Sequence, residues 1–167
     1  MVPTKPRPSV ANPYLQRPDW ISGELRDPER LWLDKNENTD PMLAEVVRAI
    51  VSGLNRDVLQ CYPETGPLYR KLAEHTGLSP GNLVLSAGSD GAIRAVFEAY
   101  IEPGDAIIHP QPTFAMYDVY CRIYGADPQP VAYQRSEIGP VLSASDLISA
   151  IKNIRPKLVC LPNPDSP

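Results

Sequence analysis

Residues Ser86–Ile93 read Ser-Ala-Gly-Ser-Asp-Gly-Ala-Ile and separate two different apolar patterns. The run Leu83–Leu85 before them is typical of a buried strand, and the apolar residues after them recur at helical spacing. A strand-to-helix junction presents unpaired backbone N–H groups and the positive end of the helix dipole, which together favour an anion such as phosphate. The alternative is an ordinary turn in which Ser89 is the N-cap residue.

Composition limits the classes of protein to which the chain can belong. It has 167 residues and a formal net charge of -4, which is enough chain for a real core and argues against nucleic acid or an anionic membrane as the main partner. No apolar run approaches the ~18 residues of a membrane span, and we expect a cytoplasmic location. Cys61, Cys121 and Cys160 have no CxxC spacing and predict reduced thiols. His75 and His109 are too separate to suggest a metal site.

The chain divides at about residue 30. Residues 1–30 form a proline-rich arm without helical or strand periodicity. From residue 31 onward, apolar runs of strand type alternate with helical patterns that end at glycines. The expected strands are 83–85, 106–109, 130–133 and 157–161, and helices are expected at 41–53, 66–77, 93–101, 114–124 and 143–151. Asp40 and Ser143 would cap the first and the last of these helices, and Gly53, Gly77 and Gly125 would end the helices that precede them. The helix at 41–53 would carry an apolar face. This alternation predicts an α/β fold: a mostly parallel sheet with helices on both faces.

Three marked loops follow the predicted strands, namely Ser86–Gly91, Pro110–Phe114 and Pro162–Pro167. Ligands of parallel sheets bind beyond the carboxyl ends of the strands, so we expect these loops to converge on one site. The sequence stops just after its fourth predicted strand, and no helix follows to cover that strand. We therefore expect residues 31–167 to be the N-terminal half of a larger domain.

Six short motifs resemble, in order, those of the fold-type I enzymes that depend on pyridoxal 5′-phosphate (PLP). From about Pro13 to Pro167 the chain is most similar to the histidinol-phosphate aminotransferase branch of that group. The motifs are Leu33–Asn38, Tyr62-Pro63 with Gly66, Ala87–Gly91, Glu102–Asp105, Pro112–Tyr117 and Pro162–Pro167. The resemblance implies PLP as cofactor and the incomplete large domain of a fold-type I enzyme.

The resemblance assigns the phosphate of PLP to Ser89, Asp90 and Gly91, largely through their backbone N–H groups. Gly91 stands where the family usually has Glu. Because a carboxylate beside a phosphate is unfavourable, we expect Asp90 to point away and to cap its own helix. Phe114, at a position where the family usually has Tyr, would stack on the pyridine ring; the alternative is a core aromatic residue.

Four further positions gain roles from the resemblance. Asn163 would hydrogen-bond the phenolic oxygen of PLP, or else serve only as a turn residue. Tyr62 would reach the PLP phosphate of the other subunit of a homodimer, or else pack within its own turn. Tyr14 and Asn36 would contact substrate, although packing of a docked arm also explains Tyr14.

The family also needs a lysine that holds PLP as a Schiff base and moves the proton at Cα. None of the five lysines, Lys5, Lys35, Lys71, Lys152 and Lys157, follows a serine in a Ser-Lys context, so we assign no catalytic residue. We expect an aminotransferase of amino-acid biosynthesis that transfers an amino group from an amino acid or amino-alcohol phosphate to a 2-oxo acid. As an isolated chain it would be inactive, needing a homodimer or a complementing C-terminal half.

Two alternatives stay open on the sequence. One is a decarboxylase or lyase of the same scaffold, similar to threonine-phosphate decarboxylase, because the residues that separate these activities lie mostly downstream. The other is a non-catalytic half-chain that binds a phosphorylated ligand or a partner subunit. A nucleotide-binding Rossmann domain is disfavoured, because Ala87–Gly91 does not match G-x-G-x-x-G.

Overall fold

The computed structural model describes residues 38–165 except Ile138, together with residues 5, 8, 11, 27, 29 and 30. The apolar run at 31–33 and the candidate residues Tyr14 and Asn36 lie outside the described residues. Within the described chain, residues 38–84 belong to one compact unit and residues 85–165 to another.

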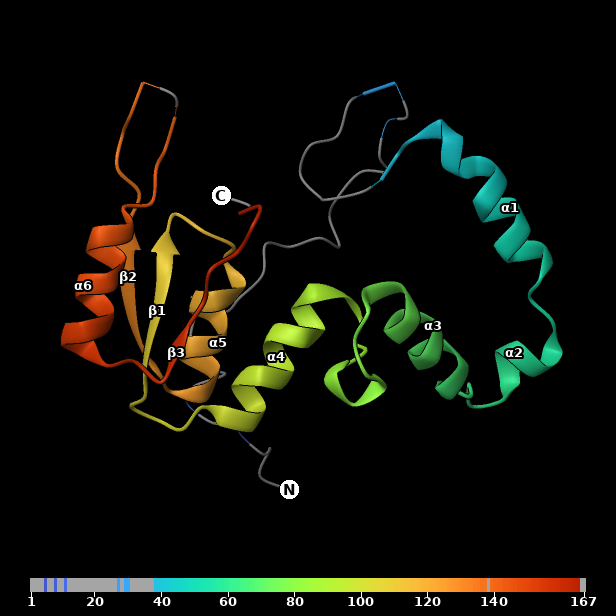
Figure 1. Cartoon of the computed structure of the whole chain (residues 1–167), viewed down its shortest axis with the longest axis horizontal. Coiled ribbons are helices and arrows are strands. Elements are labelled where there is room, and N and C mark those ends of the chain that lie inside the picture. Colours follow the sequence, from blue (N-terminus) through green and yellow to red (C-terminus); the bar gives the residue numbers. More distant parts are fainter. Residues whose placement is uncertain are drawn as a thin grey trace. The chain divides into compact units, whose positions relative to one another are not determined.

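The unit of residues 85–165 is built on a parallel sheet of three strands (Figure 1). The strands are β1 (Ala106–Gln111), β2 (Asp127–Ala132) and β3 (Leu158–Val159), in the order β2-β1-β3. Ile108 of β1 pairs with Gln129 on one side and with Val159 on the other. The chain crosses from β1 to β2 and from β2 to β3 through helices, as parallel strands require.

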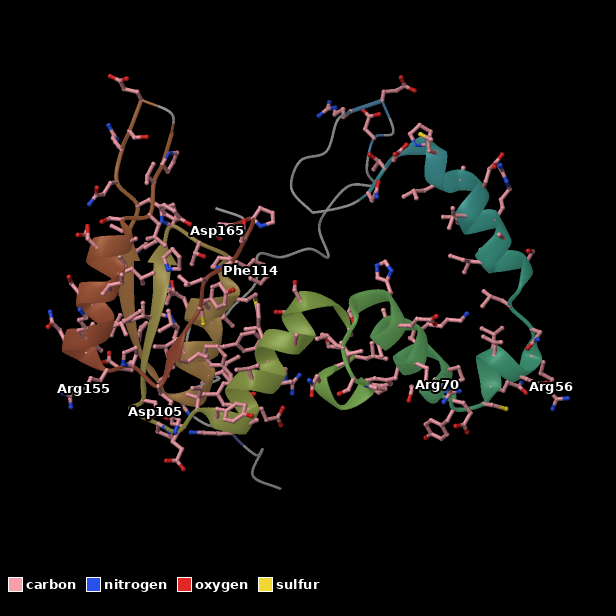
Figure 2. All side chains as sticks on the ribbon, in the orientation of Figure 1. Arg56, Arg70, Asp105, Phe114, Arg155 and Asp165 are labelled. Atoms are coloured by element: carbon pink, nitrogen blue, oxygen red, sulfur yellow. The ribbon has the colours of Figure 1, made fainter. Side chains whose placement is uncertain are left out.

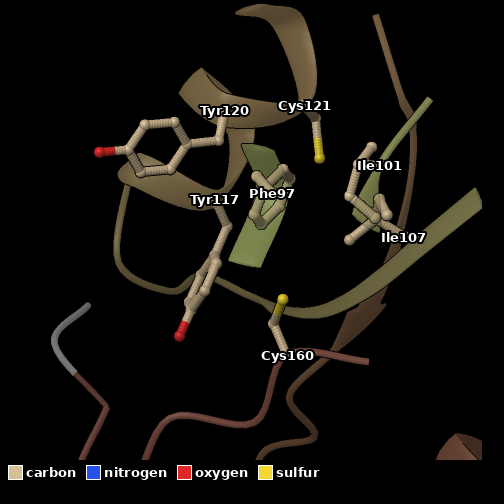
Figure 3. Packing of buried hydrophobic residues seen from close by; sticks show 7 residues of the cluster. All are labelled: Phe97, Ile101, Ile107, Tyr117, Tyr120, Cys121 and Cys160. Carbon is tan, nitrogen blue, oxygen red and sulfur yellow. The ribbon is translucent and has the colours of Figure 1, made fainter. Parts of the chain in front are cut away.

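Three helices cover the sheet: α4 (Gly88–Tyr100) and α5 (Met116–Tyr124) on one face and α6 (Ala144–Ile154) on the other (Figure 1). The core on the first face joins Phe97 of α4, Ile107 of β1 and Cys121 of α5, none of which is accessible to solvent (Figure 3). Because successive strand residues point to opposite faces, Ile108, also fully buried, faces α6. This arrangement confirms the predicted α/β class with helices on both faces.

The ends of the helices follow local signals in the sequence. The Ser143 side chain accepts from the N–H of Asp146 and caps α6. Gly125 ends α5 at φ 72°, and a Cβ atom there would lie 3.4 Å from Cβ of Pro103. Glycine suits this position because it adopts the left-handed conformation without strain and leaves room for the close approach of Pro103.

The predicted strand Leu83–Leu85 is not part of the sheet. Its backbone is extended at Leu83 (φ -118°, ψ 142°), but no described strand pairs with it, and Val84 is 82% exposed. An apolar extended segment becomes a strand only when a neighbour supplies hydrogen-bond partners. The prediction of a strand here was therefore wrong for the described residues, and the predicted strand at 157–161 is reduced to two residues.

The unit of residues 38–84 contains helices only. They are η2 (Pro41–Leu43), α1 (Ala44–Ser52), α2 (Arg56–Gln60), α3 (Gly66–Thr76) and η3 (Pro80–Asn82). The predicted N-cap Asp40 accepts from the N–H of Met42, and the predicted stop Gly77 takes a left-handed conformation at φ 70°. Helix α2 was not predicted; the side chain of Asn55 caps it by accepting from the N–H of Val58.

The apolar face predicted for the first helix is present but is not covered by the described residues. These side chains are exposed over a third or more of their surface: Met42, Val46, Val47, Ile50, Val51 and Leu54. An amphipathic helix gains its stability mainly by burying such a face. Within the described part of this unit, the apolar face of α1 is therefore left exposed. Among the described residues no helix combines the length and apolar character that crossing a membrane requires.

Phe97 is the residue on which the core of the sheet unit depends most. Replacing it by alanine should lower the free energy of unfolding by about 3–5 kcal/mol, because it removes a fully buried ring and leaves a cavity. Tyr100→Ala on the same helix is the matched control: Tyr100 is 65% exposed, and the expected loss is within about 0.5 kcal/mol. Urea unfolding measures both variants, and equal losses would contradict this core assignment.

The three cysteines should differ sharply in reactivity. Burial raises the pKa of the Cys121 thiol to about 12 and that of Cys160 to about 11, whereas Cys61 is exposed. Since the thiolate is the reactive form, a thiol-specific reagent at mildly alkaline pH should modify Cys61 alone in the folded chain and all three in urea. Rapid modification of Cys121 before unfolding would show that the core is open.

Candidate functional site

The first turn of α4 carries the predicted phosphate residues. The helix begins at Gly88, after Ala87, whose side chain cannot cap it. No side-chain cap hydrogen bond is present at this helix start, and the hydroxyl of Ser86 donates to the carbonyl of Gly88 at 2.8 Å. Ser89 lies inside the first turn and is exposed, so the alternative in which Ser89 is the N-cap residue is wrong. The turn therefore offers backbone N–H groups and a serine hydroxyl without a described side-chain cap.

The expectation that Asp90 caps its own helix is wrong: the described structure shows no side-chain cap at α4, and the carboxylate of Asp90 connects α4 to α5 instead. Its Oδ1 accepts a hydrogen bond of 2.9 Å from the hydroxyl of Tyr120, which is 5% exposed. Burial and then this hydrogen bond to Asp90 raise the pKa of Tyr120 to about 12. The carboxylate is thus engaged by a neutral hydroxyl of α5. Gly91, the next residue, is half-buried, and a Cβ there would lie 3.5 Å from Cβ of Ser86, an ordinary contact.

Phe114 lies in the loop between β1 and α5 and is half-buried (Figure 2). Its ring packs against the core cluster and meets the ring of Tyr117 edge-on, with centroids 6.2 Å apart at 90°. One part of the ring is thus fixed by the core while another part stays accessible. Both sequence-based interpretations, a core aromatic and a stacking surface, are compatible with this placement.

The C-terminal loop brings Asp165, not Asn163, to Phe114. Asn163 is exposed and no described hydrogen bond engages its side chain. Asp165 Oδ1 accepts from the hydroxyl of Thr113 at 2.9 Å and from the N–H of Phe114 at 3.3 Å, and its Oδ2 accepts from the hydroxyl of Tyr133 at 2.9 Å. Sequence reasoning gave Asp165 no role. Its signal was an acidic residue after one strand with hydroxyl residues after the other two strands.

The predicted convergence of loops is therefore present for two of the three. Thr113 and Phe114 follow β1, and Asp165 follows β3, and hydrogen bonds join them. The turn before α4 is tied to α5 instead, through Asp90 and Tyr120. Since α5 begins two residues after Phe114, the phosphate turn and the aromatic residue share one supporting helix.

Tyr62 belongs to the helical unit and lies between α2 and α3. Its side chain is 99% exposed, which does not fit a tyrosine packed within its own turn. Of the described lysines, Lys157 precedes β3, and its N–H donates to the carbonyl of Ala106, the first residue of β1. It therefore lies at the end of the sheet opposite to the loops described above.

The donor set of this region fits a phosphorylated aromatic ligand. Free N–H groups at a helix N-terminus bind phosphate, and a half-buried aromatic ring on a neighbouring loop offers a face for a flat ring. No cluster of three or more residues with metal-binding side chains occurs in the part of the chain that the structure describes. The described polar groups thus suit an organic phosphate.

Comparison with known proteins bears directly on this arrangement. The family model for aminotransferase class I and II matches residues 28–167. A histidinol-phosphate aminotransferase of Thermoanaerobacter sp. (strain X514) is 34% identical over 142 residues, which are 84% of this chain and 40% of that protein. The histidinol-phosphate aminotransferase of Staphylococcus saprophyticus is 32% identical over 162 residues, 96% of this chain and 43% of that protein. The chain thus spans about two fifths of the length of the curated relatives it matches.

Solved structures agree on the fold. The histidinol-phosphate aminotransferase of Sinorhizobium meliloti, solved in complex with pyridoxal-5′-phosphate, has a TM-score of 0.60 at 23% identity over 77% of this chain and 33% of that one. N-Succinyldiaminopimelate aminotransferase of Mycobacterium tuberculosis has a TM-score of 0.52 at 27% identity over 69% of this chain and 32% of that one. The described residues therefore have the α/β fold of such enzymes.

The link between Tyr120 and Asp90 can be tested by Tyr120→Phe. Losing a hydrogen bond to a carboxylate should lower the free energy of unfolding by about 1.5–3 kcal/mol. In the wild type, the raised pKa of Tyr120 contributes stability at pH values below the ordinary tyrosine pKa of 10.0, and this contribution is lost as the pH rises through about 12.

The Tyr120→Phe variant has no hydroxyl to ionise, so it should lack this loss of stability at alkaline pH. Urea unfolding at neutral and alkaline pH measures both effects. Tyr100→Phe, at an exposed position of α4, is the control and should match the wild type. Equal stability of the Tyr120 variant and the wild type would show that the hydroxyl contributes nothing to holding α4.

Proposed function

Because this chain belongs to the aminotransferase class I and II family, we propose that it forms the cofactor-phosphate half of a PLP-dependent aminotransferase. The observation that carries the proposal is the uncapped first turn of α4, joined through α5 to the half-buried ring of Phe114. One part of the site would hold the phosphate of the cofactor and the other its ring.

Different residues of the chain would bind different parts of the cofactor. The first-turn N–H groups and the hydroxyl of Ser89 would accept the phosphate, where the helix dipole favours its charge. Tyr120 holds the carboxylate of Asp90 at 2.9 Å, which keeps this charge engaged with α5. The ring of Phe114 would cover one face of the cofactor and exclude water from it. PLP, when bound, supplies the electron-withdrawing ring that stabilises negative charge at the substrate Cα.

The lysine that accepts and returns the Cα proton would come from residues outside this sequence. Lys157 lies at the wrong end of the sheet, and Lys71 belongs to α3 of the helical unit. We assign the remaining functions to a cytoplasmic homodimer in which the exposed Tyr62 reaches the phosphate of the neighbouring subunit. Asn163 would contact the cofactor from the C-terminal loop.

The substrates proposed for the whole protein are an amino donor and a 2-oxo acid. Relatives at 34% and 32% identity are histidinol-phosphate aminotransferases, so histidinol phosphate is the first amino donor to test. These relatives favour an aminotransferase over the decarboxylase that the sequence left open.

The phosphate assignment is tested with pyridoxamine 5′-phosphate, a form of the cofactor that needs no lysine for attachment. Ser89→Glu puts a negative charge where the phosphate would bind and should weaken binding at least about tenfold, since like charges repel at close range. The control is Ser145→Glu, because Ser145 is likewise the exposed second residue of a helix in the same unit. Calorimetric titration of the wild type and both variants measures the effect.

Three results would contradict the proposal. The first is equal weakening by both glutamates, and the second is a wild type that does not bind pyridoxamine 5′-phosphate. The third concerns the lysine: the coding region should contain a Ser-Lys segment downstream of residue 167 or on a second gene product. A stop codon without such a partner gene would rule out catalysis by this protein.

A further inference from the structure

The carboxylate of Asp165, which follows one strand of the sheet, accepts hydrogen bonds from residues that follow the other two. Thr113 follows β1, Tyr133 follows β2 and Asp165 itself follows β3. The three hydrogen bonds span 52, 51 and 32 residues of sequence, so each joins segments that are distant along the chain. One side chain thus links the loops at the edge of the sheet where parallel α/β folds bind ligands.

Two of these hydrogen bonds fix the loop that carries Phe114. The hydroxyl of Thr113 and the N–H of Phe114 both donate to Oδ1 of Asp165. The hydrogen bond from the N–H holds the backbone of Phe114, and the edge-on contact with Tyr117 holds its ring. Backbone and ring of Phe114 are therefore held by different groups.

The third hydrogen bond holds the carboxylate in place. Tyr133 donates to Oδ2 at 2.9 Å, on the side of the carboxylate away from the Oδ1 contacts. Burial, followed by this hydrogen bond and the charge of Asp165, raises the pKa of Tyr133. With donors on both oxygens, Asp165 cannot rotate without losing a hydrogen bond.

We propose that Asp165 is a positioning residue of the candidate site: it holds Phe114 where the ring faces the cofactor. This assignment rests on the proposed function, because the cofactor of that function is the ligand against which the ring of Phe114 would stack. A ring-stacking contact depends on placement within a fraction of an ångström, so a support that acts on the backbone of Phe114 controls ring binding. It does not act on the phosphate turn, which is tied to Tyr120 instead.

The test compares Asp165→Ala with Asp165→Asn. Alanine removes every acceptor, whereas asparagine keeps one oxygen that Thr113 and Phe114 can share. In Asp165→Ala we expect the amide hydrogen of Phe114 to exchange about tenfold faster, the size expected when one such hydrogen bond is lost. Asp165→Asn should keep most of this protection. NMR hydrogen exchange on the 167-residue chain measures it.

Ligand binding separates a positioning role from a merely structural one. In Asp165→Ala the affinity for pyridoxamine 5′-phosphate should fall about tenfold, while the affinity for inorganic phosphate, which has no ring, should stay unchanged. Asp127→Ala is the control, because Asp127 begins β2 at the opposite end of the sheet, where its carboxylate accepts a hydrogen bond from the side chain of Gln129. It should alter neither affinity.

Three outcomes would overturn the assignment. Unchanged exchange of the Phe114 amide in Asp165→Ala would show that the hydrogen bond does not hold this loop. Equal loss of both affinities would show general damage, and unchanged affinity for pyridoxamine 5′-phosphate would show that ring placement does not depend on Asp165. If Asp165→Ala does not fold, Tyr133→Phe and Thr113→Val each remove one donor, and the Thr113 variant should affect the Phe114 amide more.

Failure of the proposed function has a different signature. In that case the wild type itself binds neither pyridoxamine 5′-phosphate nor inorganic phosphate. The exchange of the Phe114 amide then still decides whether Asp165 holds the loop, and a positioning role toward a cofactor is rejected together with the function.

Discussion

Strand β1 has a neighbour on each edge and a helix layer on each face, and the rest of its unit follows from this constraint. Ile107 enters the core beneath α4 and α5, and Ile108 must then point to the side of α6. Both neighbours run parallel to β1, so the chain leaves all three strands at the same edge. Thr113 and Tyr133 can both donate to the carboxylate of Asp165 only because of this alignment.

Helix α5 contacts both parts of the candidate site. Near its start, Tyr117 supports the ring of Phe114, and one turn later Tyr120 holds Asp90 at the beginning of α4. Residues three apart lie on the same side of a helix, so both contacts come from one face of α5. The same face buries Cys121 in the core cluster. Displacing α5 would therefore disturb the phosphate turn and the aromatic ring together.

The features that could be predicted from the sequence are those set by local chemistry. A serine that caps α6 and a glycine that ends α5 need only their own neighbours, and both were predicted. The apolar run of β1 was recognised because this strand is buried on both faces, and that of β3 because its residues are apolar, although Leu158 and Val159 are only half-buried. The run at 83–85 has the same composition, but its pairing depends on a partner strand that local sequence does not specify. Helix α2 was missed because five residues are too few to show a period.

The candidate site shows the same division. The helix start at Gly88, with first-turn N–H groups that no side chain caps, could be expected from the sequence, because glycine and serine precede a helical pattern there. The hydrogen bond that Asp90 accepts could not be predicted, because its donor, Tyr120, lies 30 residues away in the sequence. A carboxylate in the first turn of a helix is favoured by the dipole, yet it competes with a phosphate for the same N–H groups. A buried hydroxyl from α5 resolves this conflict, because it engages the carboxylate without adding charge. In the proposed site, the same end of α4 would then serve both helix stability and phosphate binding.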